Sequence, residues 1–160
     1  MKKFLILAFL ILAGLYLYWP YHAVGKYRDA LNAGDAAAVS AMVDYAELRK
    51  SLRAQTLQKL TAESPRNGAT AILSGVMVDK LLDTLVDEKA IGTTLAIGKA
   101  IHGSEPQQIE TFRWLSLNTV AVTMTGDSAP LTFRLNGTSW KLVGKDVSAM
   151  FTKFQSLLSR

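Results

Sequence analysis

The chain opens with a long apolar run. After Lys2 and Lys3, residues 4–19 are sixteen positions without a charge. At 1.5 Å per residue, a helix of that length spans roughly 24 Å, and continuing it through residue 23 gives about the 30 Å of a bilayer's hydrocarbon core. We therefore expect residues 1–23 to form a transmembrane helix that contacts membrane lipid through residues 4–23.

The end of this run indicates whether the helix is removed or kept. A cleaved signal peptide ends in small residues of the Ala-x-Ala kind. Here the run ends in aromatic residues, which are too bulky for that site and are typical of the membrane–water interface. These interface residues are Tyr16, Tyr18, Trp19 and Tyr21. We expect an uncleaved signal anchor, with secretion after cleavage as the alternative.

Charges around the apolar run predict its orientation. Lys2 and Lys3 favour a cytoplasmic amino terminus by the positive-inside rule, although Lys26 and Arg28 weaken the bias. The predicted location is a bacterial inner membrane crossed once. Residues 24–160 would then form a single extracytoplasmic domain, in the periplasm.

Helical periodicity continues beyond the membrane segment. Val24, Tyr27 and Leu31 extend a helix to about residue 33, so the chain leaves the membrane without a linker. Gly34 is typical of a helix end, and Asp35 is typical of the residue that caps the next helix.

A third helical start lies a few residues later. Asp44, with Glu47 three positions on, predicts a capping box at the start of a helix. The helices expected after the first span residues 36–43, 44–63, 70–88 and, with a weaker pattern, 89–102.

The period then changes from helical to alternating. Val120, Val122 and Met124 alternate with threonine and alanine, and Asn136-Gly137 is a strong hairpin signal. Four strands are expected near residues 109–115, 119–125, 130–136 and 139–146, followed by a helix over about 148–158. Helices followed by an antiparallel meander predict an α+β fold.

Composition excludes several classes of protein. With 160 residues there is room for one domain and an anchor, and the absence of cysteine excludes a lipoprotein anchor, disulfides and a thiol nucleophile. The net charge of +5 is not concentrated in a stripe, so we expect no nucleic-acid partner. No cofactor is predicted.

Several short motifs resemble one bacterial family. They are Pro20-Tyr21, the segment from Tyr27 to Leu31, Gly34-Asp35, Val43-Asp44, Leu48-Arg49-x-x-Leu52, Val78-Asp79 and Trp140-Lys141-Leu142, with residues 20–52 the most specific part. Together they resemble the membrane-anchored family known as domain of unknown function 2939. The resemblance implies an envelope protein with an N-terminal membrane segment and no established activity.

The order of elements is also similar to a known architecture. Helices leading into a sheet that closes on a Trp-x-Leu strand resemble the cystatin-like or nuclear-transport-factor-2-like cone. This chain departs from the cone by its larger number of helices before the sheet, and a shared fold does not carry function with it.

Acidic residues form one candidate site. Asp79, Asp83 and Asp87 recur every four residues, so they would share one face of a helix. Such a row suits a cation or acid–base chemistry, but it is also typical of a solvated helix face. The two histidines, His22 and His102, have no nucleophile or acid at a telling spacing. We favour the solvated face and expect no catalytic or metal-binding residue.

Basic residues form the other candidate site. They are Lys26 and Arg28, just after the membrane segment, and Arg49, Lys50 and Arg53 on the helix predicted over 44–63. They predict contact with anionic lipid headgroups, worth about 1 kcal/mol per cation near a charged surface, or with a protein partner. Ordinary solubility is the alternative.

Three functional hypotheses follow from this sequence. The first is a non-catalytic envelope module that binds a ligand, lipid or protein. One alternative is a small enzyme with a pocket between helices and sheet, using Asp79, Asp83 or His102 as its base. The other is a structural tether of an envelope assembly, in which the transmembrane helix itself makes the contact.

Overall fold

The computed structural model describes residues 2–63, 76, 79, 80, 82, 83, 86, 105–127 and 129–146. Within these residues the elements are α1 (Lys2–Ala33), α2 (Ala36–Ala41), α3 (Tyr45–Glu63), β1 (Ile109–Ser116), β2 (Thr119–Met124), β3 (Leu131–Asn136) and β4 (Ser139–Lys145). An apolar N-terminal helix precedes a four-stranded antiparallel sheet, so the α+β prediction is confirmed at this level.

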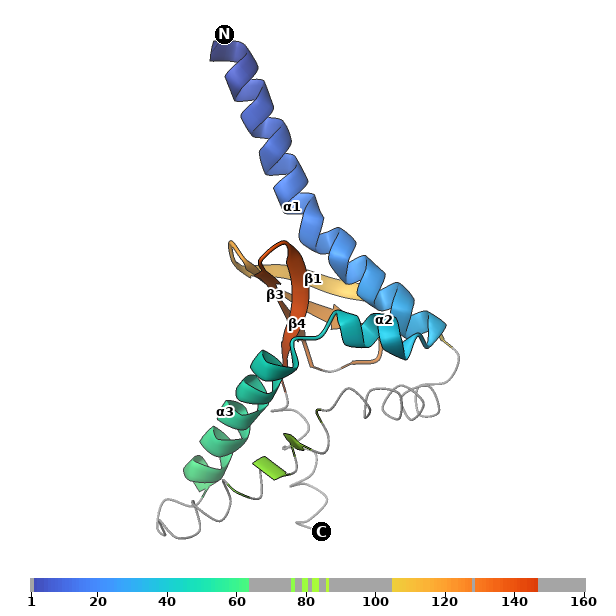
Figure 1. Cartoon of the computed structure of the whole chain (residues 1–160), viewed down its shortest axis with the longest axis vertical. Helices are drawn as coiled ribbons and strands as arrows, with labels where there is room; N and C mark the ends of the chain where they lie inside the picture. The colour runs from blue at the N-terminus through green and yellow to red at the C-terminus, as the bar shows by residue number, and fades with distance from the viewer. Residues whose placement is uncertain are drawn as a thin grey trace.

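Helix α1 is continuous from the apolar run into the domain. Its first half projects away from the rest of the molecule, and it changes direction partway along (Figure 1). Pro20 is its internal proline, and a proline cannot donate to the carbonyl four residues earlier. The predicted boundary at residue 23 therefore falls inside one helix, without a linker.

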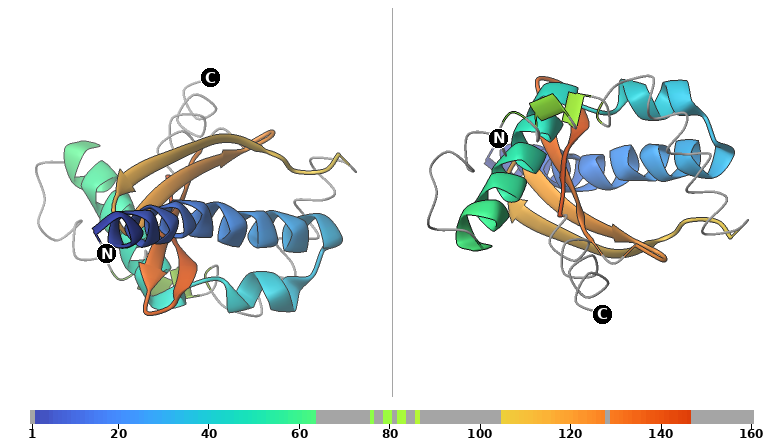
Figure 2. Two further views of the ribbon diagram at one scale, coloured as in Figure 1. Left: turned by 90° about the horizontal axis from the view of Figure 1, so that it is seen from above. Right: turned by 90° about the horizontal axis from the view of Figure 1, so that it is seen from below.

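The short connections between helices follow the predicted chemistry. Gly34 adopts a positive φ of 72° at the end of α1. The Asp35 carboxylate accepts a hydrogen bond from the Ala38 N–H at 2.9 Å and so caps α2. These two residues turn the chain back, so that α2 lies beside the end of α1 (Figure 2).

The expected capping box at α3 is only half formed. The Asp44 carboxylate accepts from the Glu47 N–H at 3.1 Å, as predicted. The Asp44 N–H, however, donates to the Leu142 carbonyl of β4 at 2.9 Å, and the Leu142 N–H donates to Met42 at 2.8 Å. The Glu47 side chain is thereby left to pair with Lys50 and Arg134. This exchange forms a short parallel bridge that covers part of the β4 edge.

The sheet is the predicted meander, with strand order β1-β2-β3-β4. The β3–β4 turn consists of Gly137 and Thr138, since Asn136 pairs with Ser139. Gly137 has a φ of +61° and Thr138 does not have a positive φ, which is the pattern of a type II′ turn. The hairpin signal at Asn136-Gly137 is therefore confirmed, with the loop one residue further along.

One face of the sheet packs against the helices. The core is formed by Val24, Tyr27, Ala30, Val39, Val43, Val120, Val122, Met124, Leu131, Phe133, Trp140 and Leu142. The strands curve around the second half of α1, which crosses this face (Figure 2). Ala121 and Val143 alternate with core residues and are each 5% exposed, so the opposite face is buried at its centre as well.

The remaining helix predictions fall largely outside the described residues. Val76, Asp79, Lys80, Leu82 and Asp83 are helical, in agreement with the helix expected over 70–88. The other positions of that helix, and the helices expected over 89–102 and 148–158, lie outside the described residues.

Candidate functional site: the junction of helix and sheet

The membrane segment and the domain meet along one stripe of α1. Tyr16, Pro20, Val24 and Tyr27 are spaced at i, i+4, i+8 and i+11, which places them on one side of a helix. Pro20 and Val24 are among the largest fully buried side chains, and Tyr27 is 6% exposed. Contact with the sheet therefore begins inside the predicted anchor, one turn before Pro20.

Aromatic rings from β1 and β4 meet this stripe. We call Tyr16, Tyr21, Phe112, Trp114 and Trp140 the aromatic junction. Tyr16 stacks on Trp114 at 6.1 Å between ring centroids, and Tyr21 meets Phe112 at 5.6 Å. Trp114 in turn contacts Trp140 edge-on at 5.8 Å. Aromatic pairs at these separations contribute about 0.5–1.5 kcal/mol each beyond the area they bury.

Hydrogen bonds fix α1 on β1 at both ends of the strand. The Tyr16 hydroxyl donates to the Leu117 carbonyl at 2.5 Å, just after β1. Just before β1, the Gln107 N–H donates to the Asn32 amide oxygen at 2.7 Å, and the Asn32 amide donates to the Gln107 carbonyl at 3.1 Å. Strand β1 therefore runs alongside the second half of α1 in the opposite direction, held at each end.

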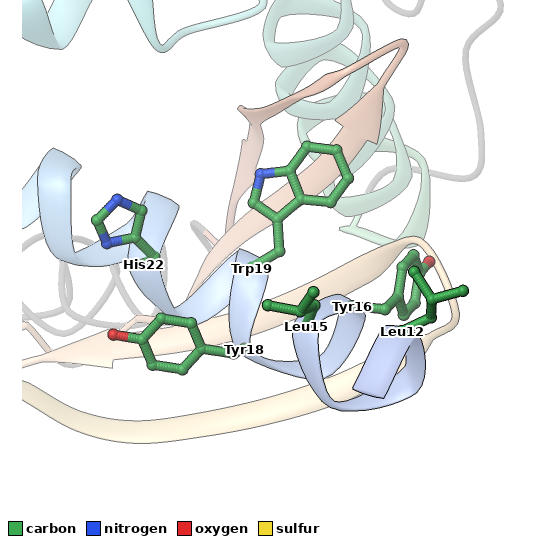
Figure 3. A pocket seen from close by; sticks show the side chains of 6 residues that line it. All are labelled: Leu12, Leu15, Tyr16, Tyr18, Trp19 and His22. Atoms are coloured by element: carbon green, nitrogen blue, oxygen red, sulfur yellow. The ribbon is translucent and has the colours of Figure 1, made fainter. Parts of the chain in front are cut away.

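The other side of α1 is open at the same level. A groove of about 420 Å³ is lined by Leu12, Leu15, Tyr16, Tyr18, Trp19 and His22, all from α1 (Figure 3). The lining is almost entirely apolar, and Tyr18 stacks on His22 at 6.2 Å. An open apolar groove on a helix of this kind suits lipid chains or an apolar partner.

The four predicted interface residues differ in their exposure, and two of them, Tyr16 and Tyr21, contact β1. Tyr18 is 61% exposed, Tyr21 48% and Trp19 39%. Tyr16 is half-buried against β1. Three of the four aromatic side chains are thus available to a membrane surface, while the fourth is bonded to the domain.

Most of the predicted lipid-contact residues form ion pairs within the chain. Arg28 pairs with Asp29 at 2.6 Å and Lys50 with Glu47 at 3.4 Å. Lys26 is exposed, and no ion pair is found for it within the described part of the chain. It is the member of the set best placed to meet a headgroup.

Two arginines of α3 face the predicted acidic row. Arg53 pairs with Asp79 at 2.8 Å, and Arg49 pairs with Asp83 at 3.5 Å. Arg49 also donates to the Val86 carbonyl from both Nε and Nη2, at 3.0 and 2.8 Å. These contacts join α3 to Asp79, Asp83 and Val86. The two aspartates, predicted on a solvated helix face, are paired with arginines.

Of the remaining candidates in the acidic row and among the histidines, the structure describes His22. Asp87 and His102 lie outside the described residues. Among the residues that the structure describes, no three acidic or histidine side chains converge as metal ligands. His22 instead lines the apolar groove on α1 (Figure 3).

A titratable group that sequence reasoning did not single out for chemistry lies in the core. Burial raises the pKa of Tyr27 well above its ordinary value, and the nearby Asp127 and Tyr45 act in the same direction. The Tyr27 ring meets Phe133 edge-on at 5.2 Å. Its neutral phenol is therefore part of the packing between α1 and β3.

The contact between Tyr16 and the β1–β2 turn was not predicted. Phe112 and Trp114 fall in the strand predicted near residues 109–115, but the sequence indicated no contact between that strand and the anchor. Leu115 and Leu117 are the available signal, because they put large apolar side chains at a strand end and turn, where polar residues are usual.

Comparison with known proteins identifies a family. A family described as protein of unknown function (DUF2939) matches residues 9–93, which is 85 of the 160 residues. This match includes the motifs over residues 20–52 and Val78-Asp79, and it ends before the Trp140-Lys141-Leu142 strand. No curated protein and no solved structure matches the chain, so the cystatin-like cone stays a prediction. Because the match covers more than half of its length, the chain belongs to the DUF2939 family.

Proposed function

We propose that this protein crosses a bacterial inner membrane once, keeps its anchor helix, and holds a non-catalytic binding domain against the periplasmic face. One observation carries the proposal: α1 is exposed and apolar in its first half and buried in the domain core in its second half. A helix of this length and composition is long enough to span a bilayer.

The packing of α1 supports retention of the helix over cleavage. Removing residues 1–23 would take away Pro20, which is fully buried, and Tyr16, which stacks on Trp114 and bonds to Leu117. A signal peptide is lost during export, so its side chains have no reason to complete the core of the mature domain. The anchor and the domain are better described as one folded unit.

A continuous helix also determines how the domain is presented. Val24 is buried in the core directly after the predicted membrane segment, so no flexible linker separates the two. The domain would sit at the membrane surface and not sweep through the periplasm. This supports a partner within reach of that surface, either anionic lipid or an envelope protein, with Lys26 as the nearest exposed cation.

The enzyme alternative receives less support. Asp79 and Asp83, two of its three proposed bases, are engaged by Arg53 and Arg49. A general base has to be within hydrogen-bond reach of a substrate proton. A carboxylate held by an arginine on a surface helix is better explained as a link between elements.

Fusion of a reporter to the carboxyl end tests the proposed address. An alkaline phosphatase fusion is expected to be active and to remain in the membrane pellet after alkaline carbonate extraction. A matched fusion of green fluorescent protein, which folds poorly after export in an unfolded state, is expected to be dark. A bright fluorescent fusion, or release of the phosphatase fusion by carbonate, would contradict the proposal.

Exchange of the exposed half of α1 separates the binding module from the tether alternative. Residues 4–15 are replaced by an unrelated apolar sequence of equal length, while residues 16–33 and their contacts with the sheet are kept. A binding domain is expected to keep its partner, detected by photocrosslinking from position 26, after this exchange. Loss of the crosslink in the exchanged protein would favour the tether.

A further inference from the structure

The sheet ends in two turns of opposite character. In a meander, the β1–β2 turn and the β3–β4 turn lie at the same end of the sheet, and Figure 1 shows both on the side from which the first half of α1 projects. Leu115, near the end of β1, is 52% exposed, and Leu117, in the first turn, is 82% exposed. The second consists of polar residues and glycine over 136–139. Polar residues are usual in an exposed turn, whereas two exposed leucines at the same end of the sheet are not, and their exposure needs an explanation.

The apolar turn lies beside the membrane segment. Leu117 accepts a hydrogen bond from the Tyr16 hydroxyl, and Tyr16 belongs to the uncharged run of α1. If the span ends at Trp19, Tyr16 lies three residues, or about 4.5 Å, inside it; if it ends at residue 23, the depth is about 10 Å. Helical side chains tilt toward the amino terminus, so the hydroxyl is no shallower than these depths suggest.

We propose that the hairpin tip, residues 115–118, enters the headgroup–acyl boundary of the periplasmic leaflet and forms a second membrane contact beside the anchor. This inference rests on the proposed function, because it requires α1 to span the bilayer. Its ligand is a phospholipid surface. The basis is continuity between the exposed apolar half of α1 and the two exposed leucines that the Tyr16 bond holds against it.

Several polar groups of the hairpin tip are bonded within the protein, which lowers the cost of placing them in such an environment. The Leu117 carbonyl and the Tyr16 hydroxyl bond to each other. The Asn118 side chain takes part in bonds with Ser116 at 2.9 Å and Thr119 at 3.1 Å, and its carbonyl accepts from the Leu135 N–H at 2.9 Å. The leucine side chains can therefore enter an apolar layer without carrying these groups in unpaired.

Strand β1 also places a cation at the level of the headgroups. Arg113 is exposed and lies two residues before Leu115 in β1, whose register with β2 shifts between Trp114 and Ser116. Two residues of extended chain span at most about 7 Å. With Leu115 at the acyl boundary, the Arg113 guanidinium would reach the phosphate layer, where an arginine can form paired hydrogen bonds.

Single cysteine variants test the depth of the tip directly, because the chain has no cysteine of its own. Full-length protein carrying Leu117→Cys is labelled with the environment-sensitive fluorophore NBD and reconstituted in vesicles of phosphatidylethanolamine and phosphatidylglycerol. Thr138→Cys in the polar turn is the matched control, since it is also exposed and lies at the same end of the sheet. Leu10→Cys in the exposed half of α1 reports on the anchor.

The proposal predicts that the probe at position 117 emits at shorter wavelength than the probe at 138 and loses intensity when doxyl-labelled lipid is added. The probe at 10 should also be quenched, and the probe at 138 should not. A water-like, unquenched signal at 117 with quenching at 10 would overturn this inference and leave the anchor intact. Absence of quenching at 10 would overturn the proposed function and this inference with it.

A second measurement excludes an effect of the fluorophore's own affinity for lipid. The unlabelled Leu117→Cys and Thr138→Cys variants are reacted in the same vesicles with a membrane-impermeant maleimide. In vesicles, the maleimide is expected to react several-fold more slowly at position 117 than at position 138. The two rates should become similar after the protein is transferred to detergent and denatured. Equal rates in vesicles would contradict insertion of the tip.

Discussion

Both halves of α1 carry large apolar side chains, but these lie in different surroundings. In the first half, Phe4 is 78% exposed and Leu10 is 60% exposed. In the second half, Val24 is 0% exposed and Ala30 is 8% exposed. Soluble monomers rarely leave a continuous apolar surface of this length uncovered. Apolar side chains are therefore covered by the domain's own sheet in the second half of α1. In our account they are covered by lipid in the first half.

The comparison locates the boundary between membrane and domain more finely than hydropathy does. Sequence alone places it at residue 23, where a helix that begins at residue 4 reaches about the 30 Å of the hydrocarbon core. The contacts of Tyr16 and Pro20 begin earlier, so residues 16–23 serve both regions. On this account, such an overlap is what allows an anchor to hold a domain without a linker.

Equivalent truncations in the two halves of α1 should have very different effects. Tyr27→Ala removes a ring that is 6% exposed and packed on Phe133, and we expect it to lower the free energy of unfolding by about 3–4 kcal/mol. Leu10→Ala should leave the free energy of unfolding unchanged, because Leu10 is exposed and does not belong to the core. Urea unfolding in detergent, followed by tryptophan fluorescence, measures both.

The control for this pair is membrane retention. Both variants should stay in the membrane after carbonate extraction, since the first half of α1 remains apolar in each. A large loss of domain stability in Leu10→Ala would show that the first half of α1 also packs on the domain, which would contradict the proposed difference between the two halves.

The buried phenol of Tyr27 should make the domain sensitive to alkali. Its pKa is raised in the folded state, so above about pH 10 the unfolded chain releases this proton before the folded chain does. The stabilisation is complete below pH 10 and falls as the pH rises above it, by on the order of 1 kcal/mol by pH 11. Tyr27→Phe should remove this part of the decline, as measured by urea unfolding at pH 8 and pH 11.

The comparison is between variants, because the chain has four tyrosines besides Tyr27. Tyr18→Phe changes an exposed tyrosine in the same helix and should leave the alkaline decline as it is in the wild type. An identical decline in wild type and Tyr27→Phe would contradict the assignment to Tyr27.

The strands and first helices could be read from the sequence because their signals are local. Alternation at Val120, Val122 and Met124 predicted β2 correctly to within one residue at its carboxyl end. Gly34 and Asp35 predicted the turn between α1 and α2. These patterns depend on the period of one element and on the chemistry of one turn.

The junction could not be predicted, because it depends on which elements meet. Nothing in the spacing of Tyr16 indicates a partner 101 positions away at Leu117. The same holds for Asp44, whose N–H bonds to β4 instead of to the Glu47 carboxylate expected from a capping box. Leu115 and Leu117 were the only signal in the sequence, as apolar residues at a strand end and in a turn.

The bond between the two regions can be tested with one atom removed. Tyr16→Phe keeps the stack on Trp114 but loses the donor to the Leu117 carbonyl, and we expect about 0.5–1.5 kcal/mol less stability. Tyr18→Phe on the open side of the helix is the matched control and should change little. Equal effects of the two substitutions on the free energy of unfolding would show that the hydrogen bond of the Tyr16 hydroxyl does not stabilise the domain.

The smallest effect is expected where charges meet at the surface. Arg53→Ala breaks the 2.8 Å pair with Asp79, but Arg53 is 52% exposed, and exposed pairs contribute about 0–1 kcal/mol. The same urea unfolding assay in low and high salt checks this, and salt should shrink the difference further. A loss well above 1 kcal/mol would indicate that this pair holds the α3 region more firmly than its exposure implies.

The intact mass of the protein extracted from membranes shows whether the anchor helix is kept as part of the folded protein. If the anchor is part of the domain's fold, the recovered chain begins at the amino terminus, with residues 1–23 present, and partitions entirely with the membrane. A shorter chain that starts near residue 24 and is recovered from the soluble periplasmic fraction would contradict the account.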